Sequence, residues 1–413
     1  MSRLLTRGHD AAAEAIQGMI AGPPPHAIVI TGPAGVGKTT LALDLAAGLL
    51  CDAPDPAQRP CRECRGCHLV ERGSHADLHR LAPSGAGNQI RIGARDEPEP
   101  GTVRRLISDL ALLPVEGGAR VALIEKADRL NEDAQSALLK TLEEPPAGVT
   151  IILCADQEDQ LLPTVRSRCV KLRLGPVAIR DIETILAEAG VADPPTAARL
   201  ARLSGGRPGI ARVWALAPEA VTARAEIARS LLDLAVEGAA RRLSVGRELL
   251  GRAAELVRAL DRAAERPTNE VPAAPAKRSR KGSQPIAGPS TETVAPKAED
   301  TSATGAADGD PDDAAVRDTR APAAERRRAA AQIVEIWRDL TRDLVLVGLG
   351  EERRLRDPAM LDELRGSTDL TATQLGPFLA RLDRTAELID ANVSPELALD
   401  VLLLAWPRRA AAA

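Results

Sequence analysis

Aromatic residues are almost absent from this sequence, which has no tyrosine, one phenylalanine and three tryptophans among 413 residues. A core built from this chain must therefore rely on Leu, Ile, Val and Ala, a composition that suits helices. The hydrophobic content of 44% still supports a sizeable core, and the length allows two or three domains.

Membrane-spanning and strongly basic features are also missing. No run of about 18 apolar residues occurs, and the N-terminal stretch lacks the apolar segment of a signal peptide. The formal net charge is −4, which argues against a surface coated in positive charge for nucleic acid. We therefore expect a soluble cytoplasmic protein without a membrane partner.

The most specific pattern present is a glycine-rich turn that joins an apolar β-branched run to a helical segment ending at residue 50. Gly-x-x-x-x-Gly-Lys-Thr in this context is typical of a P-loop, whose backbone N–H groups and following helix bind phosphate. We expect Lys38 to contact the β- and γ-phosphates of ATP or ADP, and the Thr39 hydroxyl to bind Mg²⁺. A P-loop that binds nucleotide without turning it over is the alternative. The residues predicted here to bind nucleotide are Gly32, Gly35, Gly37, Lys38, Thr39 and Thr40.

A cysteine cluster follows the P-loop helix. Four thiolates can surround Zn²⁺ tetrahedrally at about 2.3 Å, and a site with four protein ligands is structural rather than catalytic. Disulfides and an iron–sulfur cluster are the alternatives, disfavoured by the expected compartment and by the lack of other redox features. The predicted metal ligands are Cys51, Cys61, Cys64 and Cys67.

Two further expectations concern the surroundings of these cysteines. Pro54, Pro56 and Pro60 argue against a regular helix in the cysteine segment. His68 and His75 are expected to be ordinary surface residues rather than metal ligands.

Charged residues after the next buried strand, residues 121–124, bear on ATP hydrolysis. P-loop ATPases carry Asp-Glu at this point, whereas this chain has Glu125 and Lys126. Glu125 can still face the metal and is included among the nucleotide-binding residues. Lys126 cannot act as a base at neutral pH, and its charge opposes Mg²⁺ binding, which disfavours hydrolysis.

Periodicity and capping residues predict the remaining elements. The expected strand is 149–154, and the expected helices are 10–20, 102–112, 132–143 with Asn131 as cap, 180–189, 195–203, 219–265, 329–347, 360–364, 371–388 and 394–406.

Four motifs occur together, GPAGVGKTT, the four-cysteine insert, LLKTLEEPP and SRC. On these motifs, about the first 215 residues resemble the bacterial DNA polymerase III clamp-loader subunits of the AAA+ class. The resemblance implies an α/β P-loop AAA+ domain with a parallel sheet, flanking helices and a zinc insert (1–174). It also implies a small helical lid domain (175–215) and an all-α C-terminal collar domain (216–265 and 326–408).

Two relatives in this family share the motifs, the ATP-hydrolysing gamma/tau motor and the non-hydrolysing delta-prime subunit. Three departures from the motor pattern favour delta-prime: Lys126, Ala155 and Asp156 where the motor has a polar Thr, and Pro208 in place of a sensing arginine, although Arg207 could partly substitute. The alternative is a gamma/tau-like motor. A nucleic-acid-binding zinc module on an unrelated ATPase is disfavoured by the acidic composition and the scarcity of stacking aromatics.

The resemblance also implies partners and a role in the DNA polymerase III holoenzyme, a nucleotidyltransferase complex. The chain is expected to join gamma/tau and delta subunits in a hetero-pentamer that places the sliding clamp on primed DNA. Arg168 of the SRC motif is expected to act in trans, as an arginine finger in a neighbouring ATPase site.

Two segments near the C-terminus complete the predictions. Residues 266–325 have almost no large apolar side chains and are expected to be a disordered insertion, either without a dedicated role or as a weak tether. The helix 394–406 is apolar over more than one face, at Leu397, Leu399, Val401, Leu402 and Leu404, and is expected to be buried in a core or between subunits.

Overall fold

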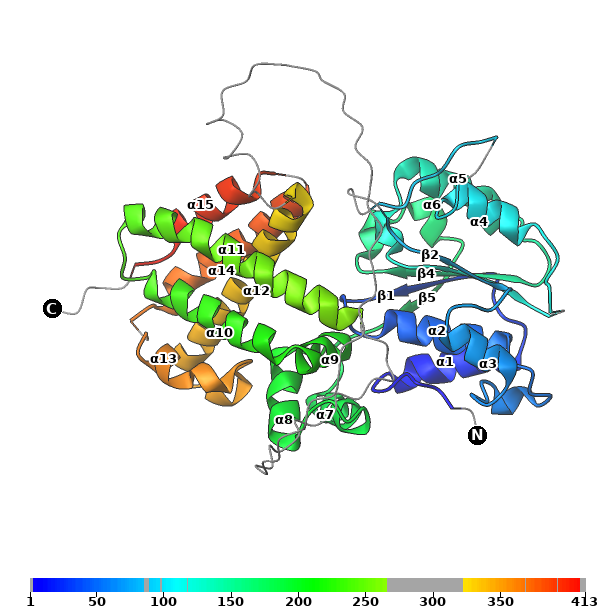
Figure 1. The fold of residues 1–413 in the computed structure, drawn as a ribbon, viewed down its shortest axis with the longest axis horizontal. Helices are drawn as coiled ribbons and strands as arrows, with labels where there is room; N and C mark the ends of the chain where they lie inside the picture. The colour runs from blue at the N-terminus through cyan, green and yellow to red at the C-terminus, as the bar shows by residue number, and fades with distance from the viewer. Residues whose placement is uncertain are drawn as a thin grey trace, which may run out of the picture.

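The computed structural model describes residues 3–84, 89–96, 99–116, 118–265, 322–367, 369–391 and 393–408. It has an N-terminal lobe built on a sheet and a C-terminal lobe made of helices, with three helices, α7 to α9, between them (Figure 1). Within the described ranges, no helix is both long enough and apolar enough to cross a membrane.

A parallel sheet of five strands forms the centre of the N-terminal lobe, in the order β2-β3-β4-β1-β5. Three of the strands, β1, β3 and β4, are buried along their whole length, which explains their mostly apolar sequences. The strands are β1 (Ala27–Thr31), β2 (Leu78–Leu81), β3 (Arg120–Ile124), β4 (Val149–Ala155) and β5 (Val170–Arg173).

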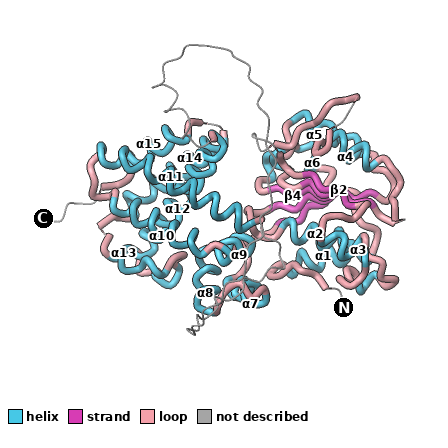
Figure 2. Tube along the Cα trace, in the orientation of Figure 1, coloured by secondary structure: helices cyan, strands magenta, loops and turns pink. Residues whose placement is uncertain are grey.

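Helices cover both faces of this sheet, as Figure 2 shows by the strands lying between two helical layers. One layer contains α1 (Asp10–Ala21), α2 (Lys38–Leu49) and α3 (Arg65–Glu71). The other contains α4 (Val103–Leu110), α5 (Glu132–Glu143) and α6 (Pro163–Arg166). The predicted parallel sheet with flanking helices is therefore confirmed.

The three middle helices pack on the α1/α2 side of the sheet and share its hydrophobic core, to which Ile182, Leu200 and Ala211 contribute. They are α7 (Ile179–Glu188), α8 (Pro194–Leu203) and α9 (Pro208–Leu216). Helix α9 follows the Gly205-Gly206 turn. Its first residues lie beside the glycine-rich loop after β1, where the Gly209 N–H donates to the Gly35 carbonyl.

The C-terminal lobe has its own core, in which three of the four aromatic residues of the chain meet. The rings of Trp337, Phe378 and Trp406 have centroids 4.8–5.3 Å apart. Leu, Ile, Val and Ala supply most of the remaining core, as the composition predicts. The helices are α10 (Pro218–Asp233), α11 (Ala239–Ala264), α12 (Ala323–Gly348), α13 (Leu361–Arg365), α14 (Ala372–Asp390) and α15 (Pro395–Ala405).

Most of the predicted disordered insertion, residues 266–321, lies outside the described residues. Helix α12 begins at Ala323, so the expectation of disorder is wrong for residues 323–325. The ends of α11 and α12 that flank this segment lie close together, with an ion pair of 2.7 Å between Arg328 and Asp261. The long connection therefore joins two helices that pack directly against each other.

Helix α15 is buried on one face only. Leu399 and Leu402 lie in the core, whereas Leu397, Val401 and Leu404 are each at least half exposed. These three residues are spaced so that they share one side of the helix, and we call them the α15 stripe. Burial within this chain therefore accounts for only part of the apolar sequence of α15.

Charged side chains form a network that joins the middle helix α8 to the C-terminal lobe and continues within that lobe. Arg199 of α8 forms two contacts of 3.2 Å with Asp357. Arg224 of α10 contacts Asp339 at 2.9 Å, and Arg356 also pairs with Asp339. Buried networks of this kind require every member to be paired, because an unpaired buried charge is costly.

Asp343 lies in the same charged region, and the pKa of its carboxyl is raised. Burial raises the pKa of its carboxyl to about 6, and the charge of Asp339 adds to this effect. The backbone N–H groups of Arg356 and Asp357 and the charge of Arg342 only partly oppose it.

The stabilisation contributed by Asp343 should depend on pH. Its folded-state pKa lies above the unfolded value near 3.8, so its contribution is complete below that value and is lost as the pH rises through about 6. A rise of the pKa from 3.8 to about 6 corresponds to a loss of about 2–3 kcal/mol in the free energy of unfolding. Unfolding free energies of the wild type and Asp343→Asn, followed by tryptophan fluorescence between pH 4 and 7, should diverge by that amount. A difference independent of pH would contradict the assignment.

Candidate functional site

The loop after β1 has the geometry that the P-loop pattern requires. Gly32, Gly35 and Gly37 adopt φ values of 148°, 79° and 114°, which L-residues with side chains rarely take. Gly37 precedes α2, so Lys38, Thr39 and Thr40 form its first turn, at the positive end of the helix dipole. The loop and the helix terminus together form an anion-binding backbone.

Lys38 folds back over this loop. Its Nζ donates to the carbonyl oxygens of Gly32 at 2.7 Å and Pro33 at 2.9 Å, and pairs with Asp156 Oδ1 at 2.5 Å. The lysine side chain is only 8% exposed. The sequence identified Asp156 as a departure from the motor pattern but did not identify it as the partner of Lys38.

Cys154 lies next to this pair, in β4. Burial raises the pKa of its thiol to about 12, and the charge of Lys38 opposes this effect. Cys154 is therefore a neutral core residue at physiological pH.

Glu125 follows β3 at the same edge of the sheet. Its carboxylate accepts bonds of 2.6 and 3.0 Å from Arg80 of β2, a partner that the sequence analysis did not find. Lys126 adopts a left-handed conformation with φ of 51° and precedes a short turn of 3-10 helix. A role for Glu125 in nucleotide binding stays a prediction. A metal ion bound with the nucleotide would have to displace Arg80 from the Glu125 carboxylate.

The middle helices approach the P-loop closely. The Gly209 N–H donates to the Gly35 carbonyl at 2.9 Å, and a Cβ on Gly35 would lie 2.7 Å from Ile210. Arg207 instead pairs with Glu335 of α12 at 2.7 Å and donates to the Ser204 carbonyl at 2.8 Å. The guanidinium of Arg207 is thus bound to the C-terminal lobe, which argues against its substitution for the arginine replaced by Pro208.

Arg168 lies after α6. Its guanidinium pairs with Glu143 Oε1 of α5 at 2.6 Å and donates to the Thr164 carbonyl at 2.9 Å. About a third of its side chain is exposed, as is half of the Glu143 side chain. The SRC and LLKTLEEPP motifs are therefore in direct contact.

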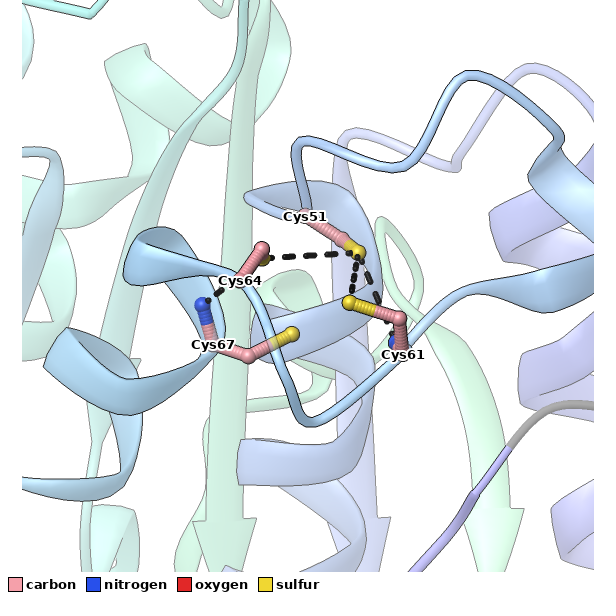
Figure 3. Close-up of side chains that lie close together, drawn as sticks. All are labelled: Cys51, Cys61, Cys64 and Cys67. Carbon is pink, nitrogen blue, oxygen red and sulfur yellow. Dashed lines mark hydrogen bonds between the residues drawn. The ribbon is translucent and has the colours of Figure 1, made fainter.

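The four predicted ligand cysteines converge at the C-terminal end of α2 (Figure 3). Their Sγ atoms all lie within 4.8 Å of one another, and Cys51 is 3.6 Å from Cys61 and 3.9 Å from Cys64. A tetrahedral ion with bonds of about 2.3 Å requires sulfurs about 3.8 Å apart. All four are free thiols, so this arrangement could hold a metal ion.

Backbone N–H groups surround these sulfurs. Cys61 N and Ala53 N donate to Cys51 Sγ at 3.5 Å, and Cys67 N donates to Cys64 Sγ at 3.3 Å. Burial opposes ionisation of Cys61, but backbone N–H groups outweigh it and lower the pKa of this thiol to about 7. Burial raises the pKa of the Cys64 and Cys67 thiols.

Two expectations about the cysteine segment need correction. No α-helix forms in residues 51–64, as the prolines predict, but helix α3 begins at Arg65 and includes Cys67, with Cys64 Sγ accepting at its N-terminus. His75 is 4% exposed rather than a surface residue, and its Nδ1 accepts from the Asp77 N–H at 3.1 Å. The sequence around His75 contains no apolar pattern that would have predicted its burial.

An ion pair joins the cysteine segment to α2. Asp44 of α2 is fully buried and pairs with Arg62, which lies between the cysteines. Arg62 also contacts Glu71 at 3.2 Å. Because α2 has 12 residues, the cluster lies roughly 18 Å along the helix from Lys38, too far to take part in phosphate chemistry.

Comparison with known proteins bears on residues 9–178, which match the family model described as DNA polymerase III, delta subunit. The delta' subunit of DNA polymerase III from Pseudomonas aeruginosa is 40% identical over 185 residues, covering 44% of this chain and 53% of that protein. The delta' subunit from Escherichia coli is 36% identical over 186 residues, covering 45% and 53%. The resemblance to delta' subunits is confirmed.

The tau subunit of Escherichia coli DNA polymerase III also matches, at 34% identity over 179 residues, covering 42% of this chain and 26% of that protein. The chain spans about half the length of the delta' relatives it matches. The family match contains the P-loop, the cysteine cluster and Arg168, and it ends before α7.

Proposed function

We propose that this chain is a delta-prime-like subunit of the DNA polymerase III clamp loader, a stator that helps place the sliding clamp on primed DNA. The observation that carries the proposal is the similarity of residues 9–178 to delta' subunits. Gamma/tau and delta subunits are the proposed partners in a hetero-pentamer. In this proposal residues 1–174 are the AAA+ domain, 175–215 the lid, and 216–265 with 326–408 the collar.

Three ion pairs favour a stator over a motor. Lys38 and Glu125, which a motor directs at the nucleotide and its metal, are paired with Asp156 and Arg80. Pro208 supplies no guanidinium to the nucleotide, and Arg207 is bound to Glu335. The alternative, a gamma/tau-like motor, is supported by the complete P-loop pattern and by the similarity to tau.

Arg168 is proposed as the arginine finger that acts in trans on a neighbouring ATPase site. Its guanidinium is partly exposed, and its partner Glu143 is itself half exposed. An ion pair of this exposure is worth about 1 kcal/mol or less, so a phosphate-rich partner site can displace Glu143 at little cost.

The four cysteines are proposed to hold a structural Zn²⁺. Four thiolates with no open position are typical of zinc sites that stabilise a fold, and the backbone N–H groups around the sulfurs favour the thiolate form. The metal would fix the segment between α2 and α3 and would take no part in nucleotide chemistry.

The α15 stripe is proposed to contact a neighbouring subunit within the collar. Three exposed apolar residues on one helix face, Leu397, Val401 and Leu404, form a continuous strip that water solvates poorly. A contact with a neighbouring subunit would bury the apolar side chains of α15 that are exposed in this chain.

The test is reconstitution with gamma/tau and delta subunits of the same organism. Clamp loading on primed DNA should require this chain, and the isolated chain should not turn over ATP, with or without DNA and clamp. The measurements are ATP hydrolysis by the isolated chain and clamp loading by the complex. Turnover by the isolated chain that Lys38→Ala abolishes would instead establish the motor.

A variant pair reports on the assembly itself. Val401→Asp should weaken incorporation into the complex by tenfold or more, because a charge in an apolar interface is costly. Leu349→Asp, at an equally exposed apolar site at the end of α12, is the matched control and should assemble normally. Equal incorporation of both variants would remove the α15 stripe from the interface.

A further inference from the structure

The ammonium group of the P-loop lysine is fully satisfied within the chain. A lysine has three N–H donors, and Lys38 Nζ has three acceptors: Gly32 O at 2.7 Å, Pro33 O at 2.9 Å and Asp156 Oδ1 at 2.5 Å. A nucleotide phosphate that binds Lys38 must therefore displace one of these groups, and only Asp156 carries a charge.

The backbone around Asp156 is fixed by the sheet. Strands β1 and β4 are parallel neighbours in which Thr31 pairs with Ala155, so the P-loop and Asp156 leave the sheet side by side. Gly32 N donates to the Ala155 carbonyl at 3.3 Å, and Asp156 N donates to Asp128 Oδ1 at 2.9 Å. The peptide group that joins Ala155 to Asp156 is thereby fixed at both its C=O and its N–H, which holds Asp156 beside Lys38.

A carboxylate in this place resists phosphate in two ways. It is tethered to the chain, so it competes with free nucleotide as an intramolecular ligand at high effective concentration. A phosphate within hydrogen-bond distance of Lys38 Nζ would also lie roughly 3–5 Å from the carboxylate, and two anions at that separation repel strongly when partly buried. Lys38 is 8% exposed and Asp156 is 30% exposed, so water screens this repulsion poorly.

We infer that Asp156 is a built-in counter-ion of the P-loop, which occupies Lys38 in place of a nucleotide phosphate and so opposes nucleotide binding by a P-loop whose sequence pattern is complete. The same contact keeps the loop folded around Lys38 without a ligand. The inference concerns the isolated chain, so it stands or falls separately from the clamp-loader assignment.

The test measures binding of methylanthraniloyl-ADP with Mg²⁺ to the purified full chain by fluorescence. Asp156→Asn keeps the shape of the side chain and removes its charge, and it should bind the nucleotide at least tenfold more tightly than the wild type. Asp156→Thr, which introduces a neutral hydroxyl, should show the same gain and provides a second variant if the first is poorly folded. Adding Lys38→Ala to either variant should abolish the gain, because the released lysine is the group that binds phosphate.

The matched control is Asp159→Asn, which removes the same charge from an exposed position three residues away. This variant should bind nucleotide as the wild type does. Wild-type binding as tight as that of the Asp156 variants, or an equal gain in Asp159→Asn, would overturn the inference. Failure of both folded Asp156 variants to gain affinity would overturn it as well, whatever the clamp-loading assay shows.

Discussion

Replacing Arg168 with alanine is expected to slow ATP hydrolysis at the neighbouring site of the assembled complex by about 10³-fold or more. A guanidinium that stabilises transition-state charge in trans is worth about 10³–10⁵ in rate, or roughly 4–7 kcal/mol. Its pair with Glu143 is half exposed and contributes far less, so loss of the finger should dominate. Single-turnover hydrolysis in the complex, stimulated by clamp and primed DNA, measures the effect.

Two further variants separate a finger from a general loss of positive charge. Arg168→Lys keeps the charge but not the planar fork, and it should recover only a small part of the rate. Arg173→Ala removes an exposed arginine from the nearby strand β5 and should leave the rate unchanged. If Arg168→Ala assembles fully and hydrolyses ATP at the wild-type rate, the proposed role is wrong.

Removal of the metal should have the second large effect, unfolding of the segment that contains the four cysteines. Structural zinc contributes on the order of 10–16 kcal/mol of apparent binding free energy, comparable with the stability of a whole domain. We expect one zinc per chain by metal analysis, and loss of that zinc in Cys64→Ser. Trypsin should then cleave after Arg62, whose side chain is only 9% exposed while the segment is folded.

Cys169→Ser is the matched control, because Cys169 is a partly buried thiol outside the cluster. It should retain one zinc per chain and the wild-type cleavage pattern. Neither variant changes Arg62 or its partners Asp44 and Glu71, so new cleavage in Cys64→Ser can be assigned to the loss of the cysteine ligand. Protein purified with no metal, or with iron, would contradict the assignment of zinc.

Elements with a strong local pattern could be predicted from the sequence. Strands β1, β3 and β4 are mostly apolar because both faces of each strand are buried. Helix α5 begins where Asn131 predicts, since the Asn131 side chain accepts from the Ala134 N–H at 3.0 Å. The grouping of the four cysteines could be predicted because they lie within residues 51–67, a segment too short to place them far apart.

Elements with a weak local pattern were missed. Strands β2 and β5 have four residues each, too few to show a period, and most of β5 is exposed. The burial of His75 has no local cause, because it depends on the packing of the segment that follows α3. The helical residues 323–325 were assigned to the insertion because their composition continues that of the preceding segment.

The sequence by itself determined the kind of site, since a glycine-rich turn, Lys38 and the first turn of α2 form an anion-binding backbone wherever they occur in this order. It also identified the four cysteines that the structure brings together. Only the tertiary structure decided that Lys38 faces Asp156, 118 residues away, that Glu125 faces Arg80, and that Arg207 turns to Glu335. The reason is that turns and helices depend on neighbouring residues, whereas the partner of a charge depends on which distant strands and helices pack side by side.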